Sequence, residues 1–300
     1  MRWLICGTVP YPSMGLTIGQ AGLYLGCASS KDGAPQVYIL DQRGERSGLP
    51  VNQGTPALLG AFVIMADILH CDPPEILLAG DDGNGDGSRL LYRYLRDNIV
   101  NYAGYGITFH YFLPDVDEHN RLLIALEDVN PRPLLCADAG FMYAAKMSGY
   151  ASVYDLFTPD AGELAFLADE NAPHPFYTQG FLLADDDNAP ELSARAHSHG
   201  NAAKIMLVKG KTDYVIQEGQ VIHSIDVPQV PALEAVGGTG DSVAGIASAL
   251  LAAGLPISES CRKAALTNRF MGQLANPTPA ASIAELLCRL PKAWEKVQNI

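Results

Sequence analysis

Residues 236–242 read Val-Gly-Gly-Thr-Gly-Asp-Ser and run directly into a segment of apolar and small residues that ends at Gly254. Apolar residues recur at helical spacing in that segment, so a helix is expected to begin at the glycines. Glycines before a helix let backbone N–H groups converge on an anion, and the helix dipole adds to the attraction. The stretch therefore predicts a phosphate-binding turn.

Asp241 follows the glycines and adds a second function to the stretch. A carboxylate at a helix start is ordinarily a cap or a dipole partner that contributes about 0.5–2 kcal/mol. Beside a phosphate, the same carboxylate could take the proton from a hydroxyl that attacks a nucleotide's terminal phosphoryl group. We expect this role as general base and keep the helix cap as the alternative.

Composition and charge bound the class of protein. The chain has 300 residues, of which 48% are hydrophobic and 18% charged, as in ordinary globular proteins. Its net charge is −13 and its pI about 4.8, which argues against non-specific binding to nucleic acids or membrane surfaces. No linker or internal repeat divides the sequence, so we expect one α/β domain over residues 1–300 that acts on a small molecule.

Cellular location is predicted from what the sequence lacks. The apolar run at residues 3–7 is short for a signal peptide and Pro10 soon follows it, and no apolar segment reaches the roughly 18 residues of a membrane span. The six cysteines show no metal-binding spacing, and we expect reduced, buried thiols. These features predict a cytoplasmic protein.

Strand and helix patterns alternate along the whole chain, which predicts a mostly parallel sheet covered by helices on both faces. The apolar runs at 213–217 and 220–225 flank Glu218-Gly219, so they predict an antiparallel edge hairpin. Residues 31–53 are turn-rich around a short strand at 37–40, and they form either another edge hairpin or an insertion. Thr55 before Pro56 predicts the N-cap of a helix.

Polar residues follow several of the expected strands. In parallel sheets, ligands bind beyond the carboxyl ends of the strands, so these residues are candidates for one site. The acidic glycine-rich loop at 80–88 suits hydroxyl recognition or a hydrated metal better than a phosphate. The candidates from this pattern are the segment from Gly7 onward, the loop 80–88 with Gly80, Asp81 and Gly83, Asp138, the segment 158–163, and Lys209-Gly210.

Three segments together resemble the ribokinase-like superfamily, and among its branches the NAD(P)H-hydrate dehydratases. Residues 158–163, Thr-Pro-Asp-Ala-Gly-Glu, are similar to that family's TPHPGE; residues 208–210, Val-Lys-Gly, to its LKG; and residues 237–241 to its GGTGD. The agreement is specific over about residues 133–275. It is loose over 1–130, where Tyr11-Pro12 and 80–85 only echo the family's YPGA and GPGLG elements.

The resemblance implies a three-layer ribokinase-like α/β/α fold and a set of roles. Asp241 would be the catalytic acid/base, and Glu163 would hold Mg²⁺ through water. Nucleotide binding would fall to Gly237, Gly238, Thr239, Gly240, Lys209 and Asn268, with the anion hole at 238–240. Substrate binding would fall to Asp138, Asp160, Gly80, Asp81 and Gly83.

The implied reaction repairs hydrated NADH or NADPH: ATP or ADP phosphorylates the hydroxyl on the damaged nicotinamide ring, and phosphate then leaves. Three departures affect the substrate half: Asp160 replaces the family's His, the 80–85 loop is acidic, and the N-terminal segment differs from the family's. A kinase that leaves its phosphate on a small alcohol is therefore a second hypothesis, and a non-catalytic nucleotide sensor a third. We also expect a homo-oligomer.

Overall fold

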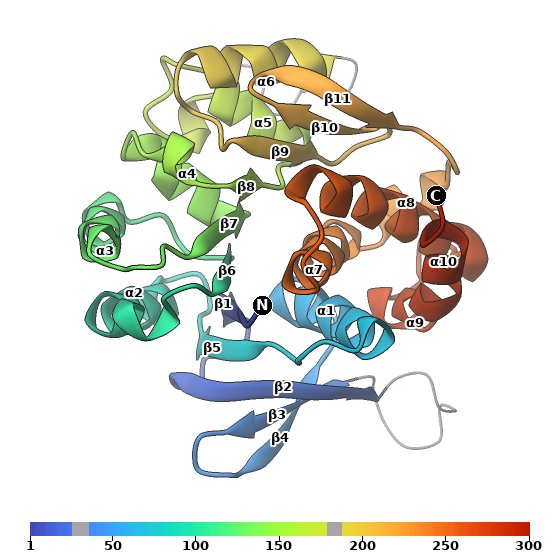
Figure 1. Cartoon of the computed structure of the whole chain (residues 1–300), viewed down its shortest axis with the longest axis horizontal. Coiled ribbons are helices and arrows are strands. Elements are labelled where there is room, and N and C mark those ends of the chain that lie inside the picture. The colour runs from blue at the N-terminus through green and yellow to red at the C-terminus, as the bar shows by residue number, and fades with distance from the viewer. Residues whose placement is uncertain (26–35, 179–187) are drawn as a thin grey trace. The chain divides into compact units, whose positions relative to one another are not determined.

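The computed structural model describes residues 1–25, 36–178 and 188–300. They form two compact units (Figure 1). The first unit comprises Met1–Ile5, Thr17–Leu78 and Asp226–Ile300, and the second comprises Cys6–Leu16 and Ala79–Ile225. Strands β1 (Trp3–Val9) and β5 (Glu75–Gly80) each begin in the first unit and end in the second.

The second unit contains the parallel part of the sheet, in the order β11-β10-β9-β8-β7-β6. The parallel strands are β6 (Gly106–His110), β7 (Leu134–Asp138), β8 (Leu156–Phe157) and β9 (Ile205–Val208). Strands β10 (Asp213–Gln217) and β11 (Gln220–Ile225) add the antiparallel hairpin at one edge. The expected α/β class, largely parallel with an antiparallel edge, is confirmed.

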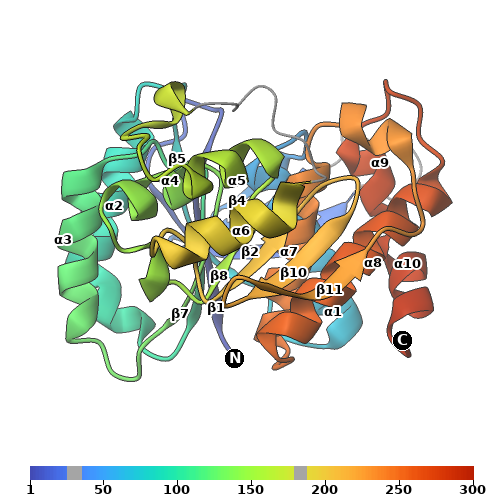
Figure 2. The ribbon, with the colours of Figure 1, turned by 90° about the horizontal axis from the view of Figure 1, so that it is seen from above.

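Helices α2, α3 and α4 lie on one side of β6 and β7 (Figure 1), and α5 and α6 pack side by side (Figure 2). Their bounds are α2 Asp86–Asn98, α3 Val116–Glu127, α4 Gly140–Met147, α5 Ala161–Ala168 and α6 Ala189–Ser198. Short 3-10 helices cover Ile99–Tyr102, Ala151–Val153 and Pro175–Tyr177. The 3-10 turn at Ala151–Val153 comes just before β8, which is only two residues long.

Aromatic rings form the core beneath these helices. The rings of Phe109 and Phe141 stack with centroids 4.2 Å apart, and Tyr154 and Phe112 meet Phe141 edge-on. Such pairs are directional, so they hold β6 and α4 in a defined relation.

The first unit contains an antiparallel sheet in the order β5-β2-β3-β4. Its remaining strands are β2 (Thr17–Leu25), β3 (Gln36–Asp41) and β4 (Arg46–Pro50). Of the two alternatives for residues 31–53, the edge hairpin is correct in the part that the structure describes, since β3 and β4 pair in register.

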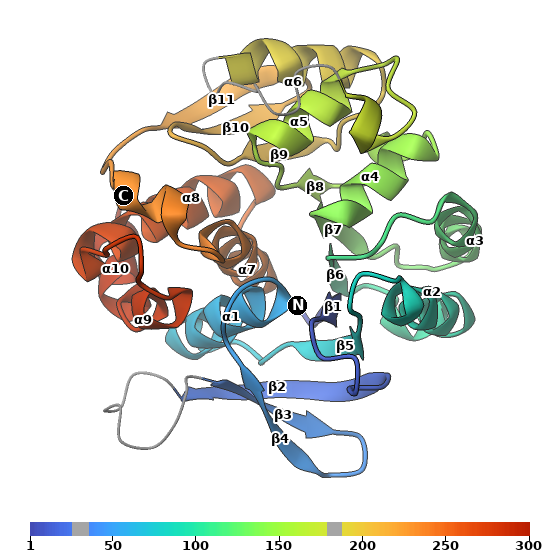
Figure 3. The same cartoon turned by 180° about the vertical axis from the view of Figure 1, so that it is seen from behind.

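Five helices lie together in the first unit (Figure 3). They are α1 (Thr55–Leu69), α7 (Thr239–Ala252), α8 (Ile257–Ala275), α9 (Ile283–Leu287) and α10 (Leu290–Val297), with a 3-10 turn at Pro231–Ala235 before α7. Helices α1 and α7 approach closely, since a Cβ on Gly245 would lie 2.3 Å from the carbonyl oxygen of Leu58.

The N-cap of α1 differs from the expectation. Gly54 holds this position with φ 68° and ψ −148°, and no side chain caps the helix, so the prediction of Thr55 was wrong. A glycine adopts such a conformation without steric penalty, which lets the helix start at Thr55 itself.

The described cysteines are free thiols, as expected, but not all of them are buried. Cys6, Cys136 and Cys261 are buried free thiols, Cys71 and Cys288 are partly exposed, and Cys27 lies outside the described residues. None of the helices in the described ranges combines the length and the hydropathy that crossing a bilayer requires.

Candidate active site

The predicted phosphate-binding turn is formed in the first unit. Gly238 is the N-cap of α7 with φ 95°, a left-handed conformation that favours glycine. An added Cβ there would lie 2.9 Å from Cγ2 of Ile283, and one on Gly237 would lie 2.7 Å from Oε1 of Gln53. Backbone conformation and close packing therefore both favour glycine at 238, whereas at 237 the Gln53 side chain could move aside.

No side chain among the described residues caps the N-terminus of α7. The first backbone N–H groups of a helix have no partner within it, and here the turn at Gly238 leaves them to solvent or to a ligand. The hydroxyl of Thr239 is used elsewhere, because its Oγ1 donates to the carbonyl of Val236 at 3.1 Å. An anion would therefore meet main-chain donors at 238–240.

Asp241 lies in the first turn of α7 and is 9% exposed. Its Oδ2 accepts a hydrogen bond of 2.6 Å from the backbone N–H of Gly54, at the start of α1. The carboxylate thus lies in the first turn of α7 and is oriented by a backbone N–H at the start of α1. A fixed carboxylate beside a turn of main-chain N–H donors can act chemically as a general base.

Asn268 joins this cluster from α8. It is 8% exposed, and its Oδ1 accepts a hydrogen bond of 2.7 Å from the hydroxyl of Ser242. Ser242 follows Asp241 directly, so the pair ties the turn to α8. Sequence reasoning missed both Ser242 and Gly54; the glycine before Thr55-Pro56 was a weak sign of a helix N-terminus with N–H groups to offer.

A second cluster forms in the second unit around an ion pair. Nζ of Lys209 lies 2.9 Å from Oδ1 and 3.1 Å from Oδ2 of Asp138, and the side chains are 13% and 3% exposed. The backbone N–H of Ala139 donates to the same Oδ1 at 2.9 Å. Asp138 is therefore a buried carboxylate whose charge is balanced mainly by Lys209.

Burial acts to lower the pKa of Lys209, but nearby carboxylates outweigh it. The negative charges of Asp138, Glu163 and Asp160 hold that pKa above its ordinary value. Lys209 is thus a permanent cation at neutral pH, available to a carboxylate or a phosphate.

Asp160 and Glu163 form a capping box at the start of α5. Glu163 N–H donates to Oδ1 of Asp160 at 2.8 Å, and Asp160 N–H donates to Oε2 of Glu163 at 2.9 Å. A backbone bridge joins Asp160 to Lys209, with Lys209 N–H donating to the carbonyl of Pro159 at 2.8 Å. The fold therefore brings four predicted residues together: Asp138, Asp160, Glu163 and Lys209.

The pKa of Glu163 is raised well above its ordinary value, first by withdrawal from water and then by the charge of Asp160. A cation would relieve both effects. Carboxylate oxygens are the ligands that Mg²⁺ prefers, and the capping box uses only Oε2 of Glu163. The residues present thus fit a hydrated Mg²⁺ held through water.

The acidic loop after β5 is organised by Asp81. Oδ1 of Asp81 accepts from the N–H groups of Gly83 and Gly85 at 2.9 and 3.0 Å, and Oδ2 from N–H and Oγ of Ser88 at 3.1 and 3.2 Å. Burial acts to raise the pKa of Asp81, but these bonds outweigh it and lower that pKa. In this conformation the carboxylate holds its own loop together at the start of α2.

Gly80 has a steric role in the same loop. A Cβ on Gly80 would lie 2.0 Å from the carbonyl oxygen of Tyr11, and its N–H donates to the carbonyl of Met14 at 2.7 Å. Substrate contact by Gly80, Asp81 and Gly83 stays a prediction.

His110 is a neighbour of Asp138 that sequence reasoning missed. It ends β6, is fully buried, and pairs in register with Asp138 on β7. Its Nε2 lies 3.8 Å from Oδ2 of Asp138. A polar residue at the carboxyl end of a strand is the signal that could have indicated it.

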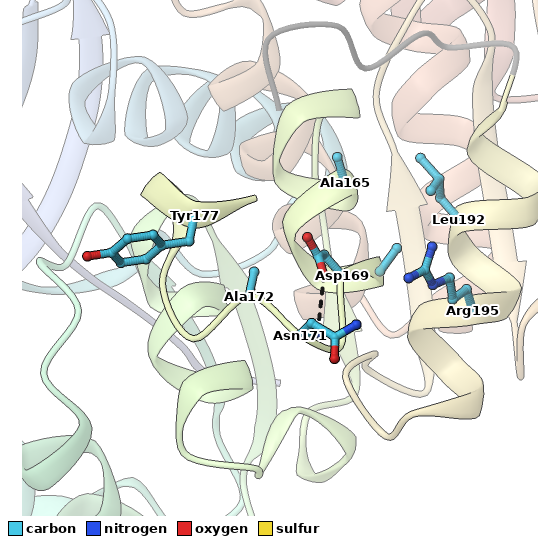
Figure 4. Close-up of a pocket in the computed structure, with 8 residues that line it drawn as sticks. Ala165, Asp169, Asn171, Ala172, Tyr177, Leu192 and Arg195 are labelled. Carbon is cyan, nitrogen blue, oxygen red and sulfur yellow. Dashed lines mark hydrogen bonds between the residues drawn. The ribbon is translucent and has the colours of Figure 1, made fainter. Parts of the chain in front are cut away.

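Figure 4 shows a cavity of about 370 Å³ in the second unit. It lies at the C-terminal end of α5, opposite the capping box, and Tyr177 and Arg195 stand on different sides of it. Its lining contains none of the predicted site residues; it consists of Ala165, Ala168, Asp169, Asn171, Ala172, Tyr177, Leu192 and Arg195.

A family model described as NAD(P)H-hydrate dehydratase matches residues 117–293. The match contains both clusters and begins after the Gly80–Gly83 loop. It includes the three motifs on which the resemblance rests.

Two relatives are similar in sequence. An uncharacterized protein of Methanocaldococcus jannaschii is 36% identical over 242 residues, covering 79% of this chain and 98% of that protein. The ADP-dependent (S)-NAD(P)H-hydrate dehydratase of Cenarchaeum symbiosum is 29% identical over 183 residues, covering 59% of this chain and 58% of that protein.

Solved structures share the fold at low sequence identity. Phosphofructokinase-2 from Escherichia coli, in complex with substrates and products, has a TM-score of 0.53 at 12% identity, covering 99% of this chain and 100% of that one. Pyridoxal kinase from Staphylococcus aureus, in complex with pyridoxal, has a TM-score of 0.50 at 13% identity, covering 91% and 88%. The expected ribokinase-like fold is confirmed.

Proposed function

Because the chain belongs to the NAD(P)H-hydrate dehydratase family, we propose that it is a nucleotide-dependent hydro-lyase that restores NADH or NADPH from their hydrated forms. The relative from Cenarchaeum symbiosum carries ADP dependence in its name, so ADP is the first donor to test and ATP the second.

The observation that carries the proposal is the carboxylate of Asp241 beside an uncapped glycine turn. Gly238 at φ 95° frees main-chain N–H groups for a phosphate, and the 2.6 Å bond from Gly54 fixes Oδ2 of Asp241. A nucleotide-binding protein without chemistry needs the donors but not the acid, which disfavours the sensor hypothesis.

In the proposed reaction, Asp241 takes the proton of the hydroxyl on the hydrated nicotinamide ring as the hydroxyl oxygen attacks the terminal phosphorus of the nucleotide. The bridging P–O bond breaks at the same time, and AMP leaves from ADP, or ADP from ATP. The donors at 238–240 stabilise the charge on the transferring group. The C–O bond then breaks and phosphate leaves, while loss of a proton from the neighbouring ring carbon restores the double bond. Phosphate leaves readily where hydroxide does not.

Supporting roles follow the chemistry of the side chains. Asp138, with Lys209 and Asp160, contacts the substrate or nucleotide, and Asn268 supports the turn. Glu163 holds Mg²⁺ through water, and the metal supplies charge neutralisation for the phosphates when bound. The homo-oligomer, the cytoplasmic location and a single domain over 1–300 stay predictions.

The test is an absorbance assay at 340 nm with hydrated NADH, Mg²⁺, and ADP or ATP in parallel. We expect nucleotide-dependent recovery of absorbance, and a loss of at least about 100-fold in kcat for Asp241→Asn, the low end for general acid–base catalysis. Asn keeps an oxygen for the Gly54 N–H, so the variant should fold.

Near-normal turnover by Asp241→Asn would contradict the assigned base. A stable phosphorylated product in the mass spectrum, without recovery at 340 nm, would overturn dehydration in favour of the small-molecule kinase. If the wild-type protein binds nucleotide but yields neither product, both the dehydratase and the kinase activity are contradicted.

A further inference from the structure

Tyr111 follows β6 in a conformation that its side chain disfavours. Its φ is 56°, in the left-handed region that bulky residues rarely adopt. Ala139, which follows Asp138 at the end of the neighbouring strand, has φ 53°. Two adjacent strands of the second unit are therefore each followed by a non-glycine residue with a strained backbone. Residues with strained backbones are concentrated at ligand sites.

The surrounding structure holds Tyr111 in this conformation. The hydroxyl of Thr8 donates to the carbonyl of Tyr111, and the hydroxyl of Ser88 accepts from the N–H of Leu113 at 2.9 Å. The carbonyl oxygen of Phe112 lies only 2.3 Å from where a Cβ on Gly140 would stand. Contacts from three other segments thus impose the strain.

The result of this strain is an exposed aromatic ring next to the buried charges. Tyr111 is 49% exposed, although its neighbours His110 and Phe112 are 0% and 2% exposed. Its ring meets that of His110 edge-on with centroids 4.7 Å apart, and Nε2 of His110 lies 3.8 Å from Asp138. His110 thus lies between the Tyr111 ring and Asp138, which is paired with Lys209.

We propose that Tyr111 is a specificity-determining residue whose ring stacks on the ring of the acceptor substrate, selecting ring-bearing hydroxyl compounds over open-chain alcohols. The inference rests on the proposed function for the identity of that acceptor, hydrated NADH. The face of the Tyr111 ring offers an apolar surface against which the face of a substrate ring can pack, whereas the carboxylate of Asp138 supplies a polar contact.

The test compares Tyr111→Asn with Tyr111→Phe in the full chain. Asn tolerates the left-handed conformation and removes the ring, whereas Phe keeps the ring and loses only the hydroxyl. We expect Asn to raise KM for hydrated NADH about tenfold with kcat within about twofold, and Phe to stay within about twofold of wild type in both. Unfolding temperatures are measured alongside, because a purely structural residue would move Tm and kcat instead of KM.

An unchanged KM in Tyr111→Asn, with wild type active, would overturn the inference and leave the proposed function intact. If wild type shows no turnover, the proposed function fails and a thermal-shift comparison decides the inference. Stabilisation by nicotinamide riboside but not by ribitol, lost in Tyr111→Asn, would then support stacking. Equal stabilisation of both proteins, or of neither, would overturn it.

Discussion

The two clusters of predicted site residues are held in place by different interactions, main-chain geometry in one and side-chain charge in the other. In the first unit, the turn at 237–241 depends on main-chain geometry: Gly238 at φ 95° and the Gly54 N–H that holds Asp241. In the second unit, Asp138, Glu163 and Lys209 depend on one another's charge. Main-chain donors do not titrate, so the turn at 237–241 should be most sensitive to substitutions that change its shape. The second cluster should be most sensitive to substitutions and pH values that change its charges.

The largest effect is expected from Lys209→Met in the second cluster. The substitution leaves Asp138 buried with an uncompensated charge, and breaking a buried pair in this way costs about 3–5 kcal/mol of stability. Urea denaturation followed by circular dichroism measures the loss.

The control is Lys209→Met combined with Asp138→Asn, which removes the charge that the single variant leaves behind. We expect the double variant to regain most of the lost stability. If the single variant unfolds at the wild-type urea concentration, the charge-based account of this cluster is wrong.

A smaller effect is expected from Gly238→Ala in the first cluster. The methyl group would stand 2.9 Å from Cγ2 of Ile283 on a backbone at φ 95°, so the turn must shift. Because the shift moves the N–H donors, we expect the affinity for ADP or ATP to fall about tenfold, or about 1.4 kcal/mol. Calorimetric titration with each nucleotide measures it.

Gly254→Ala is the matched control in the same unit. Gly254 has φ 93°, so alanine there would be strained to about the same degree as at 238, but an added Cβ would meet no described atom within 4 Å. This variant should lose stability like Gly238→Ala and keep its nucleotide affinity. Equal affinity losses in both variants would show that strain, not the shape of the turn, is responsible.

The smallest effect is a change in the pH dependence of stability in Glu163→Gln. Glu163 has a raised pKa in the folded chain, so the folded chain keeps this proton at pH values where the unfolded chain has lost it. The free energy of unfolding therefore falls as pH rises from about 4.3, the ordinary pKa of Glu, to the folded-state value. Glu163→Gln lacks this decline.

Urea unfolding of wild type and Glu163→Gln at a series of pH values checks this. Glu285→Gln makes the same amide change at the same capping position of α9, away from the charged cluster, and serves as the control. Parallel pH curves for wild type and Glu163→Gln would refute the assigned crowding of negative charge.

Much of the site was predictable because its motifs are local. The glycines and Asp241 lie within five consecutive positions, and the capping pair Asp160 and Glu163 within one helical turn. Backbone conformation and capping depend on neighbours in the chain, so their pattern is visible in the residue order. The strand–helix alternation likewise indicated the α/β class, which the fold confirms.

The partners of these residues were not predictable. Gly54 lies 187 positions from Asp241, Lys209 lies 71 from Asp138, and Ser88 lies 25 from Leu113. His110 meets Asp138 only because β6 and β7 pair in that register. Such contacts depend on strand order and helix packing, which one sequence without comparison does not specify.

Residue order alone thus determined that a glycine turn opens a helix with a carboxylate beside it, and it predicts an anion site there, since all of this follows from glycine, acid and helix at fixed spacing. Tertiary structure decided which way those groups point and what charge they carry. It brought a backbone N–H into hydrogen-bonding distance of Asp241 and a lysine into an ion pair with Asp138. It also gave Tyr111 a strained backbone and an exposed position. Orientation and charge depend on burial and on neighbours distant in the chain, and only folding brings these together.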